Sequence, residues 1–331
     1  MPANLTPEYL ENEKRYRKAR TLEEKLDALR DMLRTIPKHK GTEKLQAEIK
    51  RKIKETIEQI EKKKKRPGGR GGYGYYIPKE GAGQIVITGP PNSGKSSLIK
   101  NYTGAEPEVG DYPFTTRVPT PGMLPYEDIQ LQIIDLPPIT KEYMESWMGN
   151  IIRYADIVAI MIDVTDDNII ENWEAIVEKL EEKKIKLGGI NVESSPSDEI
   201  VTKKTIIIAN KMDLPTAEEY LEIVKEIIGD NYPIVPISVK TGEGIDKLKE
   251  LLFKALKVVR VYTKEPGKKP DLDEPYILKK GATVYDLAEK IHKELAKNLK
   301  FARIWGSGKH EGQRVNKDYI LEDKDVVEIH S

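Results

Sequence analysis

The chain has 331 residues, of which 38% are hydrophobic and 33% are charged, with a formal net charge of zero. This length is enough for two or three domains with packed cores, and no apolar run approaches the 18 or more residues of a membrane span. The absence of cysteine excludes disulfides and cysteine-ligated metals and fits an intracellular protein. We also expect no signal peptide, because the first residues are not apolar.

The zero net charge hides an asymmetry along the chain. Residues 1–80 hold 22 Lys and Arg against 13 Asp and Glu, a net charge of +9, so the remaining residues carry −9. A basic segment of this kind is typical of a nucleic-acid-binding region. The N-terminal part is therefore the candidate nucleic-acid-binding part of the chain.

Residues 1–66 are predicted to form an N-terminal helical region. Thr21-Leu22-Glu23-Glu24 resembles a capping box, and Pro37 with Gly41 separates this helix from another that begins near Thr42. Both segments carry apolar residues every three or four positions, which predicts a helical hairpin. We interpret the apolar stripes as helix packing rather than a partner-binding groove. They consist of Leu22, Leu26, Leu29 and Leu33, and of Leu45, Ile49, Ile53, Ile57 and Ile60.

Residues 67–83 are predicted to form a Gly-rich basic linker. The run Lys62–Arg66 leads into a stretch in which glycines alternate with Arg70 and three tyrosines. Cations and aromatic rings suit contact with RNA phosphates and bases, whereas the same composition also suits a solvated linker. The residues alone leave both interpretations open.

Residues 84–257 alternate between strand and helix patterns. Short apolar runs are followed by amphipathic segments, which is typical of a doubly wound, mostly parallel α/β sheet. The strands are expected at residues 85–88, 131–134, 157–162, 205–209 and 234–237, and helices at residues 171–183 and 217–228.

Residues 258–331 change to short strands around one helix. This pattern predicts a compact C-terminal α+β domain of the β-grasp kind. The expected strands are residues 258–262, 276–278, 302–305 and 326–329, and the expected helix is residues 283–297, capped by Thr283.

A phosphate-binding loop is predicted at Gly89–Ser96, which matches the pattern G-x-x-x-x-G-K-[ST] without a mismatch. The loop follows a predicted strand and precedes a helix that we expect to end at Gly104. In this arrangement the helix N-terminus faces the phosphates, Lys95 reaches the β and γ oxygens, and the Ser96 hydroxyl binds Mg²⁺. The residues expected around the phosphates are Gly89, Asn92, Ser93, Gly94, Lys95, Ser96 and Ser97.

Four polar segments beyond this loop indicate a guanine-nucleotide site. Asn210-Lys211-Met212-Asp213 follows a buried strand, and the Asp213 carboxylate can accept the two N–H donors of guanine that adenine lacks. Ser238-Val239-Lys240 follows the next strand, where a backbone N–H can meet guanine O6, although an ordinary turn also explains this segment. The other two segments surround Mg²⁺.

Asp135 closes the strand at residues 131–134 and is expected to hold the Mg²⁺ shell through water. Thr115 and Thr116 lie between Asp135 and the phosphate-binding loop. Their hydroxyls can reach Mg²⁺ and the γ-phosphate when the segment becomes ordered, which is a switching mechanism. The predicted Mg²⁺ ligands are therefore Ser96, Thr116 and Asp135, and the predicted catalytic residues are Lys95 and Thr116.

These motifs together resemble the Obg superfamily of GTPases, and most closely its developmentally regulated GTP-binding protein branch. The resemblance rests on Gly89–Ser96, on Tyr112–Thr116, on Asp135-Leu136-Pro137 and on Asn210–Asp213, with a C-terminal region similar to a TGS domain. It implies a cytoplasmic, Mg²⁺-dependent GTPase that acts with ribosomes or structured RNA, and with a regulatory protein partner, rather than with DNA or a membrane. It also implies K⁺ binding at Asn92, although a turn-favouring asparagine explains this residue equally well.

Three departures from the family pattern bear on hydrolysis. Pro138 replaces the glycine that follows Asp135-Leu136-Pro137, so the backbone N–H expected at the γ-phosphate is missing. Ile139 stands where many small GTPases carry a catalytic glutamine, and it cannot orient water. Residues 180–204 leave room for little more than a loop where members of this branch carry an inserted domain. We therefore expect a slow GTPase, with a non-catalytic sensor of GDP or a guanine alarmone, or a ribosome-binding module, as the alternative.

Overall fold

The computed structural model describes residues 9, 12, 14–16, 22–36, 42, 45, 49, 51–53, 77–105 and 119–331. The chain divides into two compact units, Met1–Tyr73 and Gly74–Ser331. In the smaller unit, α2 (Leu22–Thr35) presents one apolar face to a buried cluster. The described members of this cluster come from both segments with predicted apolar stripes and from the residues before them: Tyr9, Tyr16, Leu29, Met32, Leu33, Ile36, Leu45, Ile49 and Ile53.

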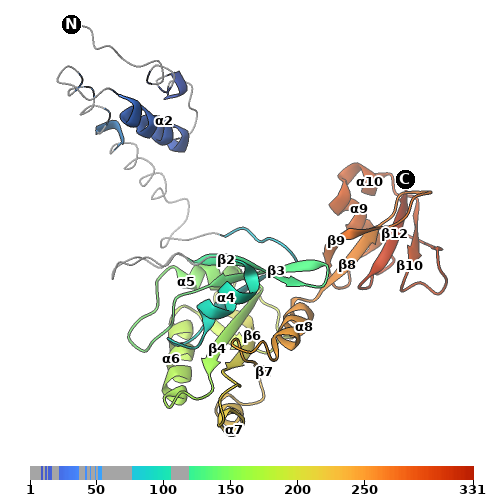
Figure 1. Ribbon diagram of the computed structural model, residues 1–331. Coiled ribbons are helices and arrows are strands. Elements are labelled where there is room, and N and C mark those ends of the chain that lie inside the picture. Colours follow the sequence, from blue (N-terminus) through green and yellow to red (C-terminus); the bar gives the residue numbers. More distant parts are fainter. Residues whose placement is uncertain are drawn as a thin grey trace. The chain divides into compact units, whose positions relative to one another are not determined.

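The larger unit begins with a seven-stranded sheet in which most neighbours are parallel (Figure 1). The strand order is β2-β3-β1-β4-β6-β5, and β7 also pairs with β6. Because β1, β3, β4 and β6 are parallel, their carboxyl ends meet at one edge. The strands are β1 (Gln84–Thr88), β2 (Thr120–Tyr126), β3 (Ile129–Asp135), β4 (Ile157–Asp163), β5 (Ile185–Gly188), β6 (Val201–Asn210) and β7 (Ile234–Pro236).

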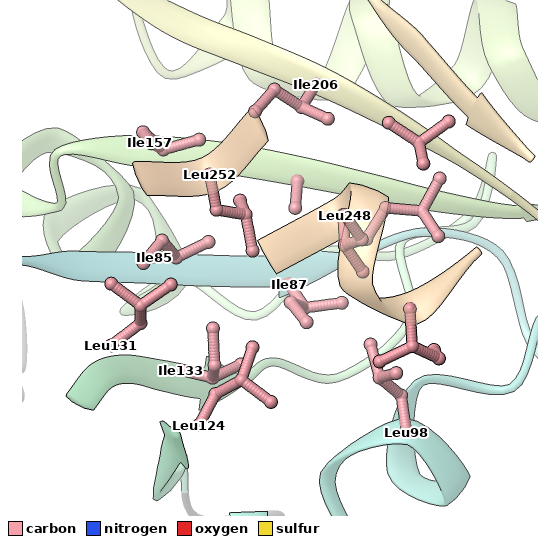
Figure 2. Close-up of a cluster of buried hydrophobic side chains, with 14 of the residues drawn as sticks. Ile85, Ile87, Leu98, Leu124, Leu131, Ile133, Ile157, Ile206, Leu248 and Leu252 are labelled. Atoms are coloured by element: carbon pink, nitrogen blue, oxygen red, sulfur yellow. The ribbon is translucent and has the colours of Figure 1, made fainter. Parts of the chain in front are cut away.

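Helices cover both faces of this sheet, as expected for a doubly wound fold. One face packs against α4 (Lys95–Thr103) and α8 (Ile245–Leu256), and Figure 2 shows Leu98, Leu248 and Leu252 of these helices facing the strand isoleucines. The other face packs against α5 (Met148–Tyr154), α6 (Ile169–Glu182) and α7 (Ala217–Ile228). α4 ends at Gly104, whose φ of 65° suits a glycine cap, as the sequence predicts.

The structure contains two strands of this sheet that the sequence analysis did not predict, β2 and β5. β2 contains Pro121 and Pro125, which argue against a strand in sequence, but β2 lies at the edge of the sheet, where a proline without an N–H is tolerated. β5 lies within residues 180–204, where the sequence analysis allows little more than a loop. This segment forms a strand that pairs in parallel with the first half of β6.

The C-terminal part forms a second sheet with the strand order β11-β10-β12-β8-β9. The expected four strands are present, and a short fifth strand, β11, extends the edge. The elements are β8 (Val258–Thr263), β9 (Asp271–Lys279), α9 (Val284–Ile291), α10 (Lys293–Lys297), β10 (Phe301–Trp305), β11 (Gln313–Val315) and β12 (Asp325–His330).

The prediction of one helix over residues 283–297 is wrong in one respect. Thr283 does cap a helix, through a capping box with Asp286. The chain then becomes extended at His292, with φ −164° and ψ 135°, and the imidazole Nδ1 of His292 accepts a hydrogen bond from the Glu294 N–H. The histidine therefore ends α9 and caps α10. Its side chain competes with the backbone for a hydrogen bond, and apolar periodicity does not reveal such competition.

Among the helices that the structure describes, none combines the length and apolar character that crossing a bilayer requires.

Candidate functional site

The phosphate-binding loop connects β1 to α4 and depends on two glycines. Gly89 has φ 148°, and a Cβ there would lie 2.1 Å from the carbonyl oxygen of Met161 on β4. Gly94 has φ 101°, and a Cβ there would lie 2.3 Å from Nδ2 of Asn210. Both positions therefore exclude a side chain, so that the loop can pack closely against the ends of neighbouring strands.

Lys95 is the first residue of α4 and is folded back over the loop. Its Nζ donates to the carbonyl oxygens of Gly89 at 3.2 Å and Pro90 at 2.6 Å, and to the Ser93 hydroxyl at 3.1 Å. Only 6% of its surface is exposed. The cation is thus held at the centre of the loop, at the positive end of a helix.

Ser96 and Asp135 come from different elements and meet in front of α4. The Ser96 hydroxyl lies 3.0 Å from the Asp135 Oδ2 at the end of β3. Hydroxyl and carboxylate oxygens are the donors that Mg²⁺ prefers. The pair therefore fits the predicted metal site in chemistry as well as in position.

Asn210 ties the predicted base-recognition segment to the phosphate-binding loop. It is buried at the end of β6, its Nδ2 donates to the carbonyl oxygen of Ser93 at 2.8 Å, and its Oδ1 accepts from the Val239 N–H at 3.1 Å. One side chain thus links three loops that are far apart in sequence. This contact is also the reason that position 94 must be glycine.

Asp213 is oriented by the segment that follows β7. The Ser238 hydroxyl donates to its Oδ1 at 2.8 Å, and the Lys240 ammonium lies 3.6 Å from its Oδ2. The Ser238 hydrogen bond and the nearby Lys240 charge outweigh the effect of burial and lower the pKa of this carboxyl. Asp213 is thus held ionised, as an acceptor of two N–H donors must be.

The segment Ser238–Lys240 already uses two of its backbone N–H groups within the chain. The Ser238 N–H donates to the Glu243 carbonyl oxygen at 3.0 Å, and the Val239 N–H donates to Asn210. Among the hydrogen bonds described for this segment, none involves the Lys240 N–H. This narrows the sequence prediction of a donor for guanine O6 to one position.

The residues that depart from the family pattern lie directly after β3. The Ile139 N–H donates to the Gly89 carbonyl oxygen at 3.2 Å, and its side chain is 1% exposed in the apolar cluster with Leu136. The side chain thus packs in the core. Pro138 lies between these two buried residues and is partly exposed.

For four of the predicted site residues, no contact with another predicted site residue is described. Thr115 and Thr116 lie outside the described residues. Ser97 is exposed on α4, and Asn92 is exposed with φ 60°, a left-handed conformation that asparagine tolerates. The backbone conformation is therefore sufficient to explain an asparagine at position 92.

Two contributing residues were not predicted. Asp163 ends β4, accepts a hydrogen bond from Lys211 and forms an ion pair with it, which orients Lys211 within the predicted base-recognition segment. Asp163 follows a buried strand, as Asp135 does, and this shared position could have identified it. Tyr102 on α4 donates to the Val239 carbonyl oxygen at 3.3 Å, a contact that only the tertiary fold brings about.

Comparison with known proteins identifies two matching families. A family described as 50S ribosome-binding GTPase matches residues 84–211, and the TGS domain family matches residues 259–331. Among solved structures, the YchF GTPase of Schizosaccharomyces pombe covers 78% of this chain and 100% of that chain, with a TM-score of 0.52 and 14% identity. At this identity the similarity shows a shared fold.

Three relatives match most of the chain. An uncharacterized GTP-binding protein of Methanocaldococcus jannaschii is 32% identical, over 93% of this chain and 92% of the relative. Developmentally-regulated GTP-binding protein 1 of Xenopus laevis is also 32% identical, over 79% and 86%. Ribosome-interacting GTPase 1 of Saccharomyces cerevisiae is 27% identical, over 93% and 99%. The first alignment extends over 367 positions, more than this chain's 331 residues, so that relative carries segments that this chain lacks.

Proposed function

The chain belongs to the family of developmentally regulated GTP-binding proteins and is a GTPase, and we propose that its hydrolysis of GTP is slow, depends on Mg²⁺ and is coupled to the ribosome. The observation that carries the proposal is the convergence of Lys95, Ser96, Asp135 and Asp213 at one edge of the sheet. These side chains provide the phosphate, metal and base contacts that a guanine nucleotide needs.

GTPases generally use Mg²⁺, which when bound neutralises charge that develops between the β- and γ-phosphates. We propose that Ser96 holds it directly, Asp135 holds it through water and Thr116 completes the set in the triphosphate state. The 3.0 Å separation of the Ser96 hydroxyl and the Asp135 carboxylate supports this assignment. Asn92 is the proposed K⁺ contact, to be tested by exchanging the monovalent salt.

The chain's own residues bind and orient the nucleotide. We propose that Lys95 exchanges its carbonyl partners for phosphate oxygens, and that Asp213 accepts guanine N1–H and the 2-amine while the Lys240 N–H donates to O6. Ile139, at the position where many small GTPases carry a catalytic glutamine, is buried in the core and offers no general base. Turnover is therefore expected to be low until a partner completes the site.

We propose that the partner is the ribosome or structured RNA and that the protein acts in the cytoplasm. The name of the Saccharomyces cerevisiae relative supports this proposal, as do the net charge of +9 on residues 1–80 and the C-terminal TGS domain. We assign the contacts to the helical region 1–66 with its linker 67–83, which precedes the GTPase domain 84–257 in sequence, and to the domain 258–331, which follows it. A regulatory protein is a further proposed partner.

One observation favours a second function. Pro138 offers no N–H to the γ-phosphate, so the site has one fewer means of distinguishing GTP from GDP. A non-catalytic sensor of GDP or of a guanine alarmone needs no such distinction. In that case the chain would bind both nucleotides equally and hydrolyse neither.

The test is steady-state phosphate release from GTP in KCl and in NaCl, with and without purified ribosomal subunits. The Lys95→Ala variant is the blank. Turnover above the blank that rises with ribosomal subunits is the expected result, and a faster rate in KCl would support the K⁺ assignment. Nucleotide binding without turnover in any condition would overturn the proposal in favour of the sensor.

A further inference from the structure

One face of the C-terminal sheet is covered by helices and the other carries a separate set of side chains. Ala302, Ile304, Val315 and Val327 pack with Leu287 of α9 in the buried cluster. Because side chains alternate along a strand, the neighbours of these residues lie on the opposite face. The side chains expected there from β10, β11 and β12 are Phe301, Arg303, Trp305, Arg314, Val326, Glu328 and His330.

Two arginines lie side by side on this open face. Arg303 on β10 and Arg314 on β11 are directly opposite each other in the antiparallel pair, and both are exposed. Like charges in this position repel each other and destabilise a sheet. The pairing of these two arginines with each other therefore does not stabilise the sheet.

Neither arginine is neutralised by a carboxylate within the part of the chain that the structure describes. Glu328 is the other cross-strand neighbour of Arg303, but its carboxylate is already bound by Lys264 and by His330, the latter at 2.7 Å. Glu328 is also buried, which removes it from contact with a ligand. The two guanidinium groups thus form an uncompensated cationic pair that is open to solvent.

Planar groups stack in a row beside this pair. The Arg314 guanidinium lies 3.9 Å from the Phe301 ring centroid, and the His330 ring is stacked on Phe301 with centroids 4.4 Å apart and an interplanar angle of 11°. Lys264 lies over Trp305 at 4.7 Å. Phe301 thus contacts both Arg314 and His330, of which Arg314 is exposed and His330 is partly exposed.

We propose that this open face, defined by Phe301, Arg303, Trp305, Arg314 and His330, binds a single-stranded segment of RNA. Phosphates of the strand lie between Arg303 and Arg314, and unpaired bases stack on the outer planes of Arg314 and His330. Uncompensated positive charge beside flat groups is complementary to a polyanion that carries flat bases. This inference rests on the proposed function, because it names the RNA contact of the TGS domain.

The experiment measures fluorescence anisotropy of an unstructured 12-nucleotide RNA with the full chain bound to GDP. The double variant Arg303→Glu, Arg314→Glu is expected to bind at least tenfold more weakly. Its salt dependence, the slope of log affinity against log salt, should fall by about 1 to 2, because two phosphate contacts are lost. Arg303→Lys, Arg314→Lys keeps the charge and should lose less.

The matched control is Lys293→Glu, Lys297→Glu, which makes the same change of charge at two exposed positions of α10. This control should bind RNA as the wild type does. Equal weakening in both double variants would overturn the proposal, since it would show a general charge effect. Binding to phosphatidylserine vesicles, but not to RNA, that depends on Arg303 and Arg314 would also overturn it.

Two further measurements separate this inference from the proposed function. Affinity for GDP and basal GTP hydrolysis should be unchanged in the arginine variant, because neither residue lies at the nucleotide site. If ribosomal subunits fail to stimulate the wild type but RNA binding still depends on the arginine pair, the ribosome coupling is wrong and the RNA-binding face is supported. If RNA binding is insensitive to the pair, the RNA-binding face is wrong regardless of the stimulation.

Discussion

Two almost fully buried cations, Lys95 and Arg260, differ in what surrounds them. Lys95, 6% exposed, is held by two carbonyl oxygens and a hydroxyl of the phosphate-binding loop. Arg260 on β8, 2% exposed, is held by carboxylates. These are Asp128 at 2.7 Å, Asp323 at 2.6 Å and Glu127 at 2.5 Å.

The carboxylates of this second site come from two parts of the larger unit. Glu127 and Asp128 form the turn between β2 and β3, whereas Asp323 precedes β12. Burial alone would lower the pKa of Arg260, but the hydrogen bonds that its guanidinium donates to the carboxylates outweigh burial and raise that pKa above its ordinary value. Arg260 therefore stays charged and joins the turn of the GTPase sheet to the C-terminal sheet.

The difference teaches how the same chain uses buried charge for two purposes. The oxygens described around Lys95 are neutral carbonyl and hydroxyl oxygens, and phosphate oxygens can take their place as acceptors of stronger, charge-assisted hydrogen bonds. Three carboxylates neutralise an arginine completely, and such a site has no capacity for a ligand. The first arrangement is suited to binding and the second to joining parts of the fold.

The largest expected effect tests the joining role. Arg260→Met removes the cation and leaves three neighbouring carboxylates, which should lower the free energy of unfolding by about 3 kcal/mol. Denaturant unfolding of the C-terminal domain measures this. Lys268→Met, at an exposed lysine paired with Glu265, is the control and should change stability by about 0.5 kcal/mol or less. Equal stability of Arg260→Met and wild type would contradict this role.

The same ion pairs predict a pH dependence. Burial raises the pKa of Asp128 and Asp323, but hydrogen bonds from Arg260 and, for Asp128, from Tyr262 outweigh it, so both pKa values lie below the ordinary 3.8. The stabilisation is present above that pH and is lost as the pH falls through the lowered values. The advantage of wild type over Arg260→Met should therefore shrink in acid.

The next prediction tests whether Asp213 makes the candidate nucleotide site selective for guanine. Asp213→Asn replaces an acceptor of two N–H donors by an amide, so affinity for GDP should fall about 100-fold or more. Xanthosine diphosphate should gain affinity, because its 2-oxo group can accept from the new amide. Isothermal titration with both nucleotides measures this change. Ser238→Ala, which removes only the orienting hydroxyl, should have a smaller effect, and an unchanged affinity in Asp213→Asn would place base recognition elsewhere.

A third buried cation, Lys203, is also held by neutral carbonyl oxygens, and its pKa shows the effect of burial on such a cation. Its Nζ donates to the carbonyl oxygens of Arg153 at 3.2 Å and of Ala155, and desolvation lowers its pKa to about 8. Between pH 8 and 10.5 the unfolded chain binds a proton here that the folded chain does not, so stability rises with pH. Over this interval wild type should gain about 2 kcal/mol relative to Lys203→Met. Parallel stability curves would show that Lys203 keeps its ordinary pKa.

The smallest effect concerns Pro138. Pro138→Gly restores a backbone N–H near the γ-phosphate position and should increase the preference for a non-hydrolysable GTP analogue over GDP about tenfold. Pro138→Ala restores the N–H without the flexibility of glycine, and should give the same change. A gain in the glycine variant alone would indicate that backbone freedom, rather than the missing donor, limits recognition of GTP.

Local sequence was sufficient for the polar segments of the candidate site. Gly89–Ser96 and Asn210–Asp213 each carry their chemistry within a few consecutive residues, and each follows a buried apolar strand. The edge at which parallel strands end then brings the segments together without further information. For the same reason Asp163, which follows such a strand, was within reach of the sequence analysis.

Contacts between segments that are distant in sequence could not be predicted from local motifs. Pro121 and Pro125 argue against a strand until β2 is known to lie at the sheet edge, and the division of residues 283–297 depends on one histidine cap. The joining role of Arg260 depends on residues more than a hundred positions away. Periodicity contains no information on any of these pairings.

The sequence by itself determined the doubly wound fold, the C-terminal α+β domain and the residue types of the candidate nucleotide site, because strand periodicity and short motifs are local properties; the TGS domain was expected from the family resemblance. Only the tertiary structure decided which polar groups are bound within the chain and which remain exposed. Lys95, Arg260, Arg303 and Arg314 are all cations in the sequence, and what distinguishes them is the set of neighbours that the fold places around each. Charge is a property of the residue, but its partners are a property of the fold.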